Sequence, residues 1–180
     1  IINGGSEGQL QQSDIGLLIF EEPSSYPADV GGRGPPVRQA RARQIAWGDD
    51  AKEIGGGTPT LVTFDSERYD TDGFHDTGSN TERLTVPADG KYAIGCNLSL
   101  GNGAMGAFNW TMELLLNGAT VIGALKQWIV SDTMILSLHV EYALTAGDYV
   151  EVRVTHDNGM VNEYVKQADN YSPEFWMHKL

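Results

Sequence analysis

Apolar and polar residues alternate along most of the chain after Val37. In the segment 91–100 (KYAIGCNLSL) every second residue is apolar: Tyr92, Ile94, Cys96, Leu98 and Leu100. The segments 108–116, 134–144 and 150–154 show the same alternation. A period of two places alternate side chains on one face of a strand, so these four segments predict β-strands with one buried face. No segment shows a helical period over a dozen residues.

Turn signals separate the predicted strands at short intervals. Asn117-Gly118 lies between two alternating segments and is a strong signal for a two-residue hairpin. Proline, glycine, asparagine and aspartate mark further turns at 87–90, 145–148 and 156–159. Short antiparallel strands at regular spacing predict an all-β sandwich, jelly roll or barrel.

Some predicted strands also carry apolar residues on the face that should meet solvent. These residues are Leu115, Ile135 and Ala143, and Trp128 and Ile129 lie in a similarly apolar stretch. Two interpretations fit: scattered surface hydrophobes, which are common, or a second face that neighbouring subunits cover. The alternation by itself favours neither.

The first 36 residues differ in composition from the rest of the chain. They are rich in Gly, Ser, Pro and Gln, and they hold one short apolar run with the residues Ile15, Leu17, Leu18, Ile19 and Phe20. Such a composition is typical of an extended arm that becomes ordered on a partner. We therefore predict an extended N-terminal attachment arm at 1–36 and a folded trimerisation and binding domain at 37–180.

The charge of the chain is acidic overall but uneven. Twelve basic and twenty-four acidic residues give a formal net charge of −12, which disfavours nucleic-acid binding by the chain as a whole. Four arginines, with no acid among them, lie close together: Arg33, Arg38, Arg41 and Arg43. Because no aromatic residues interleave with them, we interpret this segment as contacting an acidic surface on a neighbouring subunit or partner rather than nucleic acid. These arginines and the apolar run of the arm are the predicted partner-docking residues.

Membrane insertion and disulfide bonding receive no support from the sequence. No run approaches the roughly 18 consecutive apolar residues that a membrane span needs. The single cysteine, Cys96, cannot form an internal disulfide, and no signal peptide is recognisable at the start.

Motifs for catalysis or cofactor binding fail in their context. The segment 101–106 (GNGAMG) fits G-x-G-x-x-G, but a predicted strand follows it where a dinucleotide site requires a helix. A G-x-S-x-G motif is absent, and Cys96 has the parity of a buried strand residue. The four histidines (His75, His139, His156 and His178) are dispersed. We therefore expect no enzymatic activity and no cofactor.

The segment 70–76 (DTDGFHD) resembles the opening of a calcium loop. Asp70, Asp72 and Asp76 could converge on a hard cation, but the calcium-hand pattern also needs a glutamate at the twelfth position between two helices. That position is Thr81, and the flanking segments are predicted strands. Aspartate and glycine are equally typical of turns, so we interpret the segment as a turn without metal and keep a calcium-dependent binder or enzyme as an alternative.

An ordered set of short motifs carries a resemblance to a known family. The set comprises VTFDSERYDTDGFHD at 62–76, LTVPADGKYAI at 84–94, LLLNG at 114–118, ALTAGDYVEVRV at 143–154 and FWMHKL at 175–180. Together, over about residues 38–180, they resemble the complement C-one-q globular-head domain of the tumour-necrosis-factor-like superfamily. The segment from RQARAR at 38–43 to DTDGFHD is especially similar to versions of this domain in bacteriophage virion proteins. The collagen repeat that precedes many animal members is absent here, and residues 1–36 match no known pattern.

The resemblance implies a ten-strand antiparallel jelly-roll sandwich that works as a tight homotrimer and catalyses nothing. From it we expect a structural protein at the virion surface: a capsid decoration, a head fibre or a tail fibre. Its arm would dock on capsid or tail proteins, and its exposed loops would bind a host cell-surface glycan or protein. The alternative is a secreted complement-like module that recognises glycans or proteins.

Overall fold

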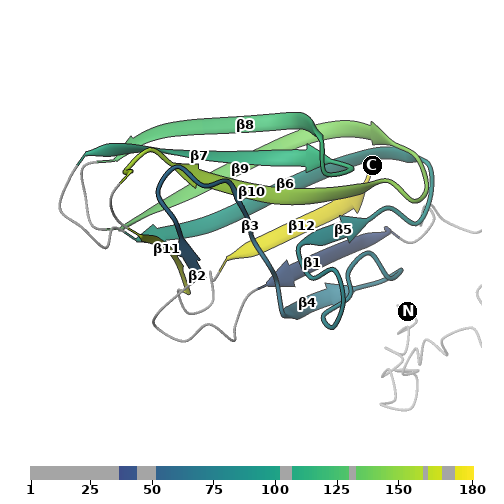
Figure 1. The fold of residues 1–180 in the computed structure, drawn as a ribbon. Coiled ribbons are helices and arrows are strands. Elements are labelled where there is room, and N and C mark those ends of the chain that lie inside the picture. Colours follow the sequence, from purple (N-terminus) through teal and green to yellow (C-terminus); the bar gives the residue numbers. More distant parts are fainter. Residues whose placement is uncertain (1–36, 44–51, 102–106, 130–132, 160–161, 168–172) are drawn as a thin grey trace, which may run out of the picture. The chain divides into compact units, whose positions relative to one another are not determined.

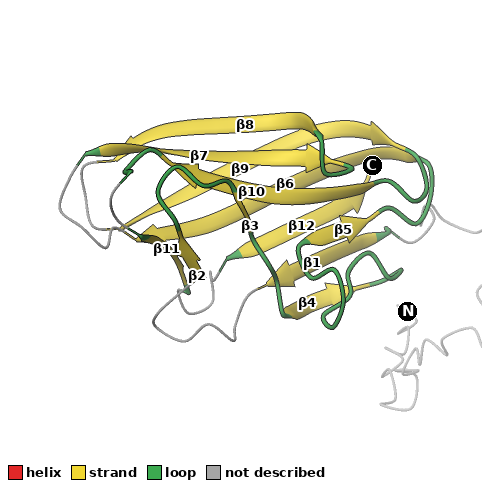
Figure 2. Cartoon of the chain, viewed as in Figure 1, coloured by secondary structure: helices red, strands yellow, loops and turns green. Residues whose placement is uncertain are grey.

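The computed structural model of the chain describes residues 37–43, 52–101, 107–129, 133–159, 162–167 and 173–180. These residues form twelve strands (Figures 1 and 2). In chain order the strands are β1 (Gln39–Arg43), β2 (Lys52–Ile54), β3 (Thr60–Leu61), β4 (Ser66–Asp70), β5 (Arg83–Thr85), β6 (Gly90–Gly101), β7 (Phe108–Leu116), β8 (Thr120–Ile129), β9 (Thr133–Leu144), β10 (Tyr149–His156), β11 (Glu163–Lys166) and β12 (Glu174–Lys179).

Strand β6 is the centre of a seven-stranded antiparallel sheet, which we call sheet A. Along one edge β6 pairs with β9, from Gly90 opposite Leu144 to Gly101 opposite Thr133. Along its other edge it pairs first with β12 and then with β11. The sheet continues from β12 through β1 to β4, and from β11 to β2.

A second antiparallel sheet, sheet B, packs over sheet A. Its order is β3-β10-β7-β8, and β5 pairs with the start of β10 next to β3. The two sheets form the two layers of a sandwich in Figure 1. Without the short strands β2 and β11, each sheet would have five strands, so this antiparallel pair accounts for the difference from the ten strands expected.

The four segments of alternating residues are confirmed as strands β6, β7, β9 and β10. The predicted apolar face of β6 is fully buried, with Tyr92, Ile94, Cys96 and Leu98 each at 0% exposure. Aromatic rings join distant segments in the core, including Phe64 with Phe175 at a centroid separation of 5.6 Å. Burial of such large apolar side chains is the main force that holds the two sheets together.

The predicted hairpin at Asn117-Gly118 is also confirmed, and it joins β7 to β8. Both residues have positive φ angles, +51° and +72°, as a two-residue turn between right-twisted strands requires. The Asn117 side chain donates to the Asp148 carboxylate at 2.9 Å and accepts the Tyr149 N–H at 3.0 Å. The hydrogen bond from the Asn117 amide lowers the pKa of the Asp148 carboxyl most, and the hydrogen bond from the Thr145 N–H lowers it further.

The described residues contain no helix, and hence none long and apolar enough to cross a membrane.

Candidate functional site

Two long strands at one side of the sandwich have an open backbone edge. Within the described residues, β8 pairs only with β7, and β9 pairs only with β6. The two strands contact each other through side chains: a Cβ atom added to Gly123 of β8 would lie 2.6 Å from the Val140 Cγ1 atom of β9. Long apolar edge strands are prone to pair with other chains, so native proteins usually cover or interrupt them.

Large apolar side chains are exposed along this side of the molecule. Trp128 of β8 and Ile135 of β9 are each 54% exposed, and Val121 and Tyr142 are also exposed. Their neighbours Leu125 and Val140 are only partly buried against the core. Trp128 pairs with Asn109 on the outer face of sheet B, and Ile135 pairs with Ser99 on the outer face of sheet A, so the exposed side chains flank the open edge on both sides. Large exposed apolar side chains of this kind mark surfaces that bind another protein. We call the exposed apolar residues of β8 and β9 the apolar edge.

The outer face of sheet A carries a row of stacked aromatic rings. Gly95 of β6 lies opposite both His139 of β9 and Trp176 of β12. Because Gly95 has no side chain, the Trp176 ring lies over its backbone, and a Cβ atom there would overlap the indole. Trp176 stacks on His139 and on His178, with centroid separations of 5.5 Å in both cases.

A buried carboxylate lies beside this aromatic row. Glu174 of β12 is 2% exposed. One of its carboxylate oxygens accepts a hydrogen bond from Arg41 of β1 at 2.8 Å, and the other accepts one from Arg68 of β4. The two guanidinium groups are each about one-third exposed. A buried carboxylate is stable when paired and hydrogen-bonded in this way, and the cluster links three adjacent strands of sheet A.

The predicted docking arginines are therefore partly engaged within the chain. Arg41 binds Glu174, and Arg38 lies 3.6 Å from Asp72 with its side chain 43% exposed. Arg43 lies at the end of β1 and is half-buried. Their role in docking stays a prediction. Arg33 and the apolar run of the arm lie outside the described residues.

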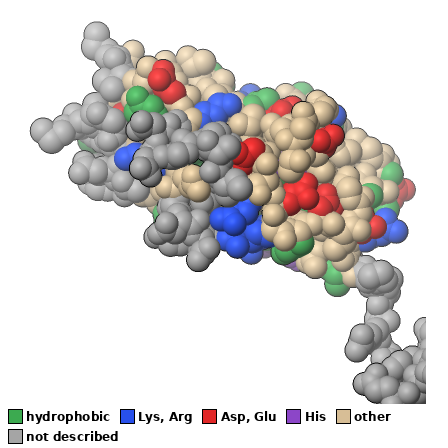
Figure 3. Space-filling view, turned by 90° about the horizontal axis from the view of Figure 1, so that it is seen from below, with side chains coloured by type: hydrophobic (Ala, Val, Ile, Leu, Met, Phe, Trp, Pro, Cys, Tyr) green, Lys and Arg blue, Asp and Glu red, His purple; other side chains and the backbone are tan. Residues whose placement is uncertain are grey.

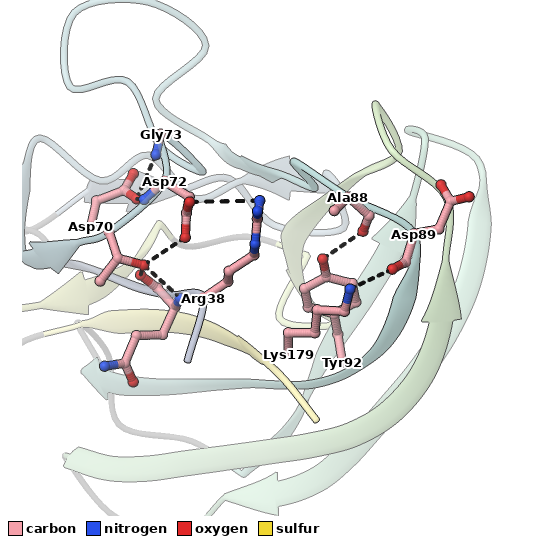
Figure 4. A network of polar contacts seen from close by, with 10 residues as sticks. Arg38, Asp70, Asp72, Gly73, Ala88, Asp89, Tyr92 and Lys179 are labelled. Carbon is pink, nitrogen blue, oxygen red and sulfur yellow. Dashed lines mark hydrogen bonds and ion pairs between the residues drawn. The ribbon is translucent and has the colours of Figure 1, made fainter. Parts of the chain in front are cut away.

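The segment 70–76 is a turn in which the carboxylates bind backbone amides. Asp70 accepts the N–H groups of Asp72, Gly73 and His75 at 2.8–3.0 Å. Asp76 accepts the N–H groups of Gly78 and Ser79. Figure 4 shows the Asp70–Gly73 contact and the Arg38–Asp72 ion pair close together. The prediction of a turn is confirmed, and the absence of a bound metal stays a prediction.

The same view shows how the last strand is fixed at this end of the sandwich (Figure 4). Lys179 donates to the Asp89 carbonyl at 2.7 Å, and the Tyr92 hydroxyl donates to the Ala88 carbonyl at 2.6 Å. Burial raises the pKa of Tyr92. The phenol is therefore a structural donor rather than a candidate base.

The one cysteine of the chain is buried, and the described residues contain no cluster of side chains that could hold a metal ion. Cys96 is fully buried, and burial, assisted by the Glu174 carboxylate, raises the pKa of its thiol well above the usual range. A thiol in that state is an inert core group. In the part of the chain that the structure describes, no group of three or more His, Cys, Asp or Glu side chains could hold a metal ion.

The charged groups on the face shown in Figure 3 are of both signs. Acidic and basic side chains lie in small neighbouring groups there, and hydrophobic side chains are scattered between them. Such a mixed face provides no extended basic stripe for nucleic acid.

The sequence indicated part of the apolar edge. It singled out Ile135, Ala143 and Trp128, and all three are exposed. Leu115 is 2% exposed, so its apolar character needs no neighbouring subunit. The register of β7 and β8 shifts between Leu114 and Leu115, where Ile122 of β8 is the extra residue. The side chain of Ile129 lies outside the described set.

The aromatic row and the Glu174 cluster were not anticipated from the sequence. Each depends on which strands are neighbours in sheet A, and the pairing of β12 with β6 and β1 is not visible in local alternation. Glycine at position 95 was the one available signal, since a glycine inside a strand often marks a close approach of another group.

Comparison with known proteins supports the fold. The sequence matches no protein-family model and no curated protein. Among solved structures, the crystal structure of murine APRIL at pH 8.5 superposes with a TM-score of 0.56 and 9% sequence identity. The match covers 80% of this chain and 99% of the APRIL chain. The chain therefore shares the two-sheet jelly-roll β-sandwich fold of that structure.

Proposed function

We propose that this protein is a non-enzymatic homotrimer at a virion surface, where it serves as a capsid decoration, head fibre or tail fibre. Residues 1–36 attach it to capsid or tail proteins, and its jelly roll faces outward. The exposed loops stabilise the particle or adhere to a host cell-surface glycan or protein.

The observation that carries the trimer is the apolar edge. Among the described residues of a single chain, β8 and β9 have no strand partner on one side, and Trp128 and Ile135 are each more than half exposed. A second copy that covers this edge would bury those side chains and shield the open backbone. Closed rotational symmetry then limits the assembly to a small ring, for which the fold suggests three members.

Sedimentation of the full chain tests the trimer. We expect a particle of three times the 19.6 kDa chain mass at micromolar concentration. The variant Ile135→Glu places a charge in the apolar edge and should sediment as a monomer. The matched control Ser79→Glu alters an exposed loop residue and should leave the trimer intact. A wild-type chain that sediments as a monomer would refute the proposal.

The virion role is supported by the sequence resemblance and by the composition of residues 1–36. Multivalency gives this arrangement its strength, because three modest anchors on one trimer bind together far more tightly than one. We expect a chain without residues 1–36 to remain a folded trimer that no longer attaches to particles. Retained attachment of that trimer would show that the anchor lies elsewhere.

Arg38 offers a test of the secondary contacts. Its side chain is more exposed than that of Arg41, and it does not take part in the Glu174 cluster. Arg38→Glu should therefore weaken attachment without opening sheet A, and the loss should shrink as salt is added. Equal attachment at low salt would exclude this arginine from the docking surface.

Antibody labelling of purified particles separates the remaining possibilities. We expect tens to hundreds of copies on each particle for a capsid decoration and few for a fibre. A complete absence of label from particles, together with binding of the trimer to cell-surface glycans or proteins, would favour the secreted module.

A further inference from the structure

Four dipeptides in the described part of the chain place a glycine directly after an asparagine or an aspartate. They are Asp72-Gly73, Asp89-Gly90, Asn117-Gly118 and Asn158-Gly159. At such a pair the glycine nitrogen can attack the carbonyl carbon of the preceding side chain, because glycine has no side chain that hinders the approach. Asparagine is chemically labile there, whereas the negative charge of an aspartate repels the nucleophile. The two Asn-Gly pairs are therefore the candidate sites of spontaneous deamidation.

Hydrogen bonds hold the Asn117 side chain at both ends. Its Nδ2 atom donates to the Asp148 carboxylate at 2.9 Å, and its Oδ1 atom accepts the Tyr149 N–H at 3.0 Å. The Asn117 N–H donates to the Tyr149 carbonyl at 2.9 Å, so the backbone is fixed as well. Attack by the Gly118 nitrogen requires the Asn117 side chain to leave both partners, which lowers the population of reactive conformers.

The Asn158 side chain is held at one end only. Its Nδ2 atom donates to the Glu163 carboxylate at 3.2 Å. Among the described residues, the Asn158 Oδ1 atom and the Gly159 N–H have no hydrogen-bond partner. Gly159 is exposed, and a Cβ atom there would meet nothing within 4 Å. Water and base therefore reach the reacting nitrogen.

We propose that Asn158 is a deamidation site of the folded protein, and that its conversion loosens the pairing of β11 with β2. The Gly159 nitrogen gives its proton to a base in the solvent and forms a bond to the Asn158 Cγ atom. The bond from Cγ to Nδ2 breaks, the leaving nitrogen takes up a proton, and ammonia departs from a cyclic succinimide. Water then opens the ring: its oxygen stays on one of the two carbonyl carbons, and its protons pass to the ring nitrogen and to solvent. Opening at one carbonyl carbon gives aspartate, and opening at the other gives isoaspartate.

The surroundings of this turn make both products disruptive. The Glu163 carboxylate is fully buried and accepts the Asn158 amide, so a carboxylate at position 158 replaces a donor with a like charge. Isoaspartate in addition lengthens the backbone by one carbon atom. The backbone has little room for this atom on the side of Gly56, where even a Cβ atom would overlap the Asn158 carbonyl oxygen.

Both effects act on the β2–β11 pair. Gly56 follows β2 by two residues, and Glu163 of β11 lies opposite Ile54 of β2. The two strands lie side by side at the end of the sandwich away from the C-terminus (Figure 1). The consequence is a slow chemical change that weakens one short strand pair, whether or not the chain associates.

Peptide mapping of the aged full chain by mass spectrometry tests the proposal. Cleavage after Arg153 and Lys166 releases one peptide that holds both Asn158 and Asn162, and Asn162 is an internal control because a glutamate follows it. After prolonged incubation at mildly alkaline pH, we expect deamidation at Asn158 to be about tenfold faster than at Asn117, as the loss of an additional hydrogen bond implies. Deamidation at Asn117 that equals or exceeds that at Asn158 would overturn the proposal.

Two further measurements separate the fold from the local sequence. In urea the two Asn-Gly pairs should deamidate at equal rates, because unfolding removes their hydrogen bonds, and a preference for Asn158 that persists there would refute the structural argument. Asp148→Ala removes the partner of the Asn117 Nδ2 atom. This variant should raise deamidation at Asn117 about fivefold and leave the rate at Asn158 unchanged. An unchanged rate at Asn117 would likewise count against the proposal.

Asn158→Asp reproduces the charge of the product and tests the loosening. Hydrogen exchange of the full chain should show the β11 amides exchanging about tenfold faster in this variant than in the wild type. The control Asn80→Asp adds the same charge at an exposed loop position and should leave β11 unchanged. Unchanged exchange in Asn158→Asp, or an equal increase in both variants, would show that the Glu163 contact does not couple Asn158 to β11.

Discussion

Glu151 of β10 is a buried acidic residue whose surroundings disfavour a negative charge. It is 6% exposed, and burial, together with the nearby Glu82 carboxylate, raises the pKa of its carboxyl even though Arg83 opposes the shift. A raised folded-state pKa in an acid means that the folded chain favours the protonated form. Stability from this group is therefore complete below the ordinary pKa of a glutamate and is lost as the pH rises from that value through the raised pKa of the folded chain.

We expect Glu151→Gln to raise the free energy of unfolding at pH 7 and to leave it nearly unchanged at pH 3.5. Urea titration at both pH values measures the difference. A variant that is less stable than wild type at pH 7 would show that the ionised carboxylate makes a favourable contact.

Gly95 is the residue on which the aromatic row depends. Because a Cβ atom would overlap the Trp176 indole, Gly95→Ala should displace the ring from its histidine neighbours and cost about 1–3 kcal/mol of stability. Urea unfolding and tryptophan fluorescence measure the two effects. Gly159→Ala is the matched control, since a Cβ there meets nothing within 4 Å. If both variants lost the same stability, the loss in Gly95→Ala would come from the change in backbone flexibility and not from the overlap with Trp176.

At the scale of the elements, Glu174 joins strands that are far apart in the sequence. β12 is the last strand of the chain, and its carboxylate binds arginines from β1 and β4. Removal of the Glu174 carboxylate would break its ion pairs with Arg41 and Arg68, although both arginine side chains are partly exposed to water.

We expect Glu174→Ala to lower the free energy of unfolding by about 1–3 kcal/mol. Glu141→Ala, at an exposed position of β9, should change the free energy of unfolding by less than about 0.5 kcal/mol. Denaturant unfolding of both variants provides the measurement. If the two losses were the same, the cluster would contribute nothing specific to sheet A.

The strands were largely predictable because burial of one face leaves a period of two in the sequence. β7 shows this clearly, with Phe108, Trp110 and Met112 buried and the residues between them half-buried. In β6 both faces are buried from Tyr92 to Cys96, so the period of two appears there in the residue types and not in the exposure. The short strands β2, β3 and β11 were not predicted from alternation, since two to four residues are too few to display a period. The Glu174 cluster was not predictable either, because its partners meet only through long-range pairing.

At the scale of the whole molecule, the jelly roll followed from the order of several motifs rather than from any one of them. Local patterns limited the fold to a sandwich, jelly roll or barrel, and the resemblance selected among these. The charged residues of the DTDGFHD segment suggested a metal site from composition alone, whereas in the structure the Asp70 and Asp76 carboxylates bind the amides of their own turn.

Association should also appear in the stability of the whole molecule. If folding and trimer formation are linked, the melting temperature must rise with protein concentration. We expect such a rise for the wild-type chain and none for Ile135→Glu, measured by calorimetry over a hundredfold concentration range. A concentration-independent melting temperature in the wild type would show that the folded chain gains nothing from its neighbours.

The first and last strands of the jelly roll are hydrogen-bonded neighbours, with Gln39 opposite His178 and the Lys179 N–H bound to the Arg38 carbonyl. The polypeptide thus enters and leaves the sandwich at one end, beside the turn at Asp89. If residues 1–36 attach the protein to a surface as proposed, a peptide epitope joined after β12 would emerge next to the attachment point and would be shielded by that surface. The turn at 157–159 follows the far end of β10, opposite the start of β7, and is the better insertion site for a scaffold that presents antigens outward.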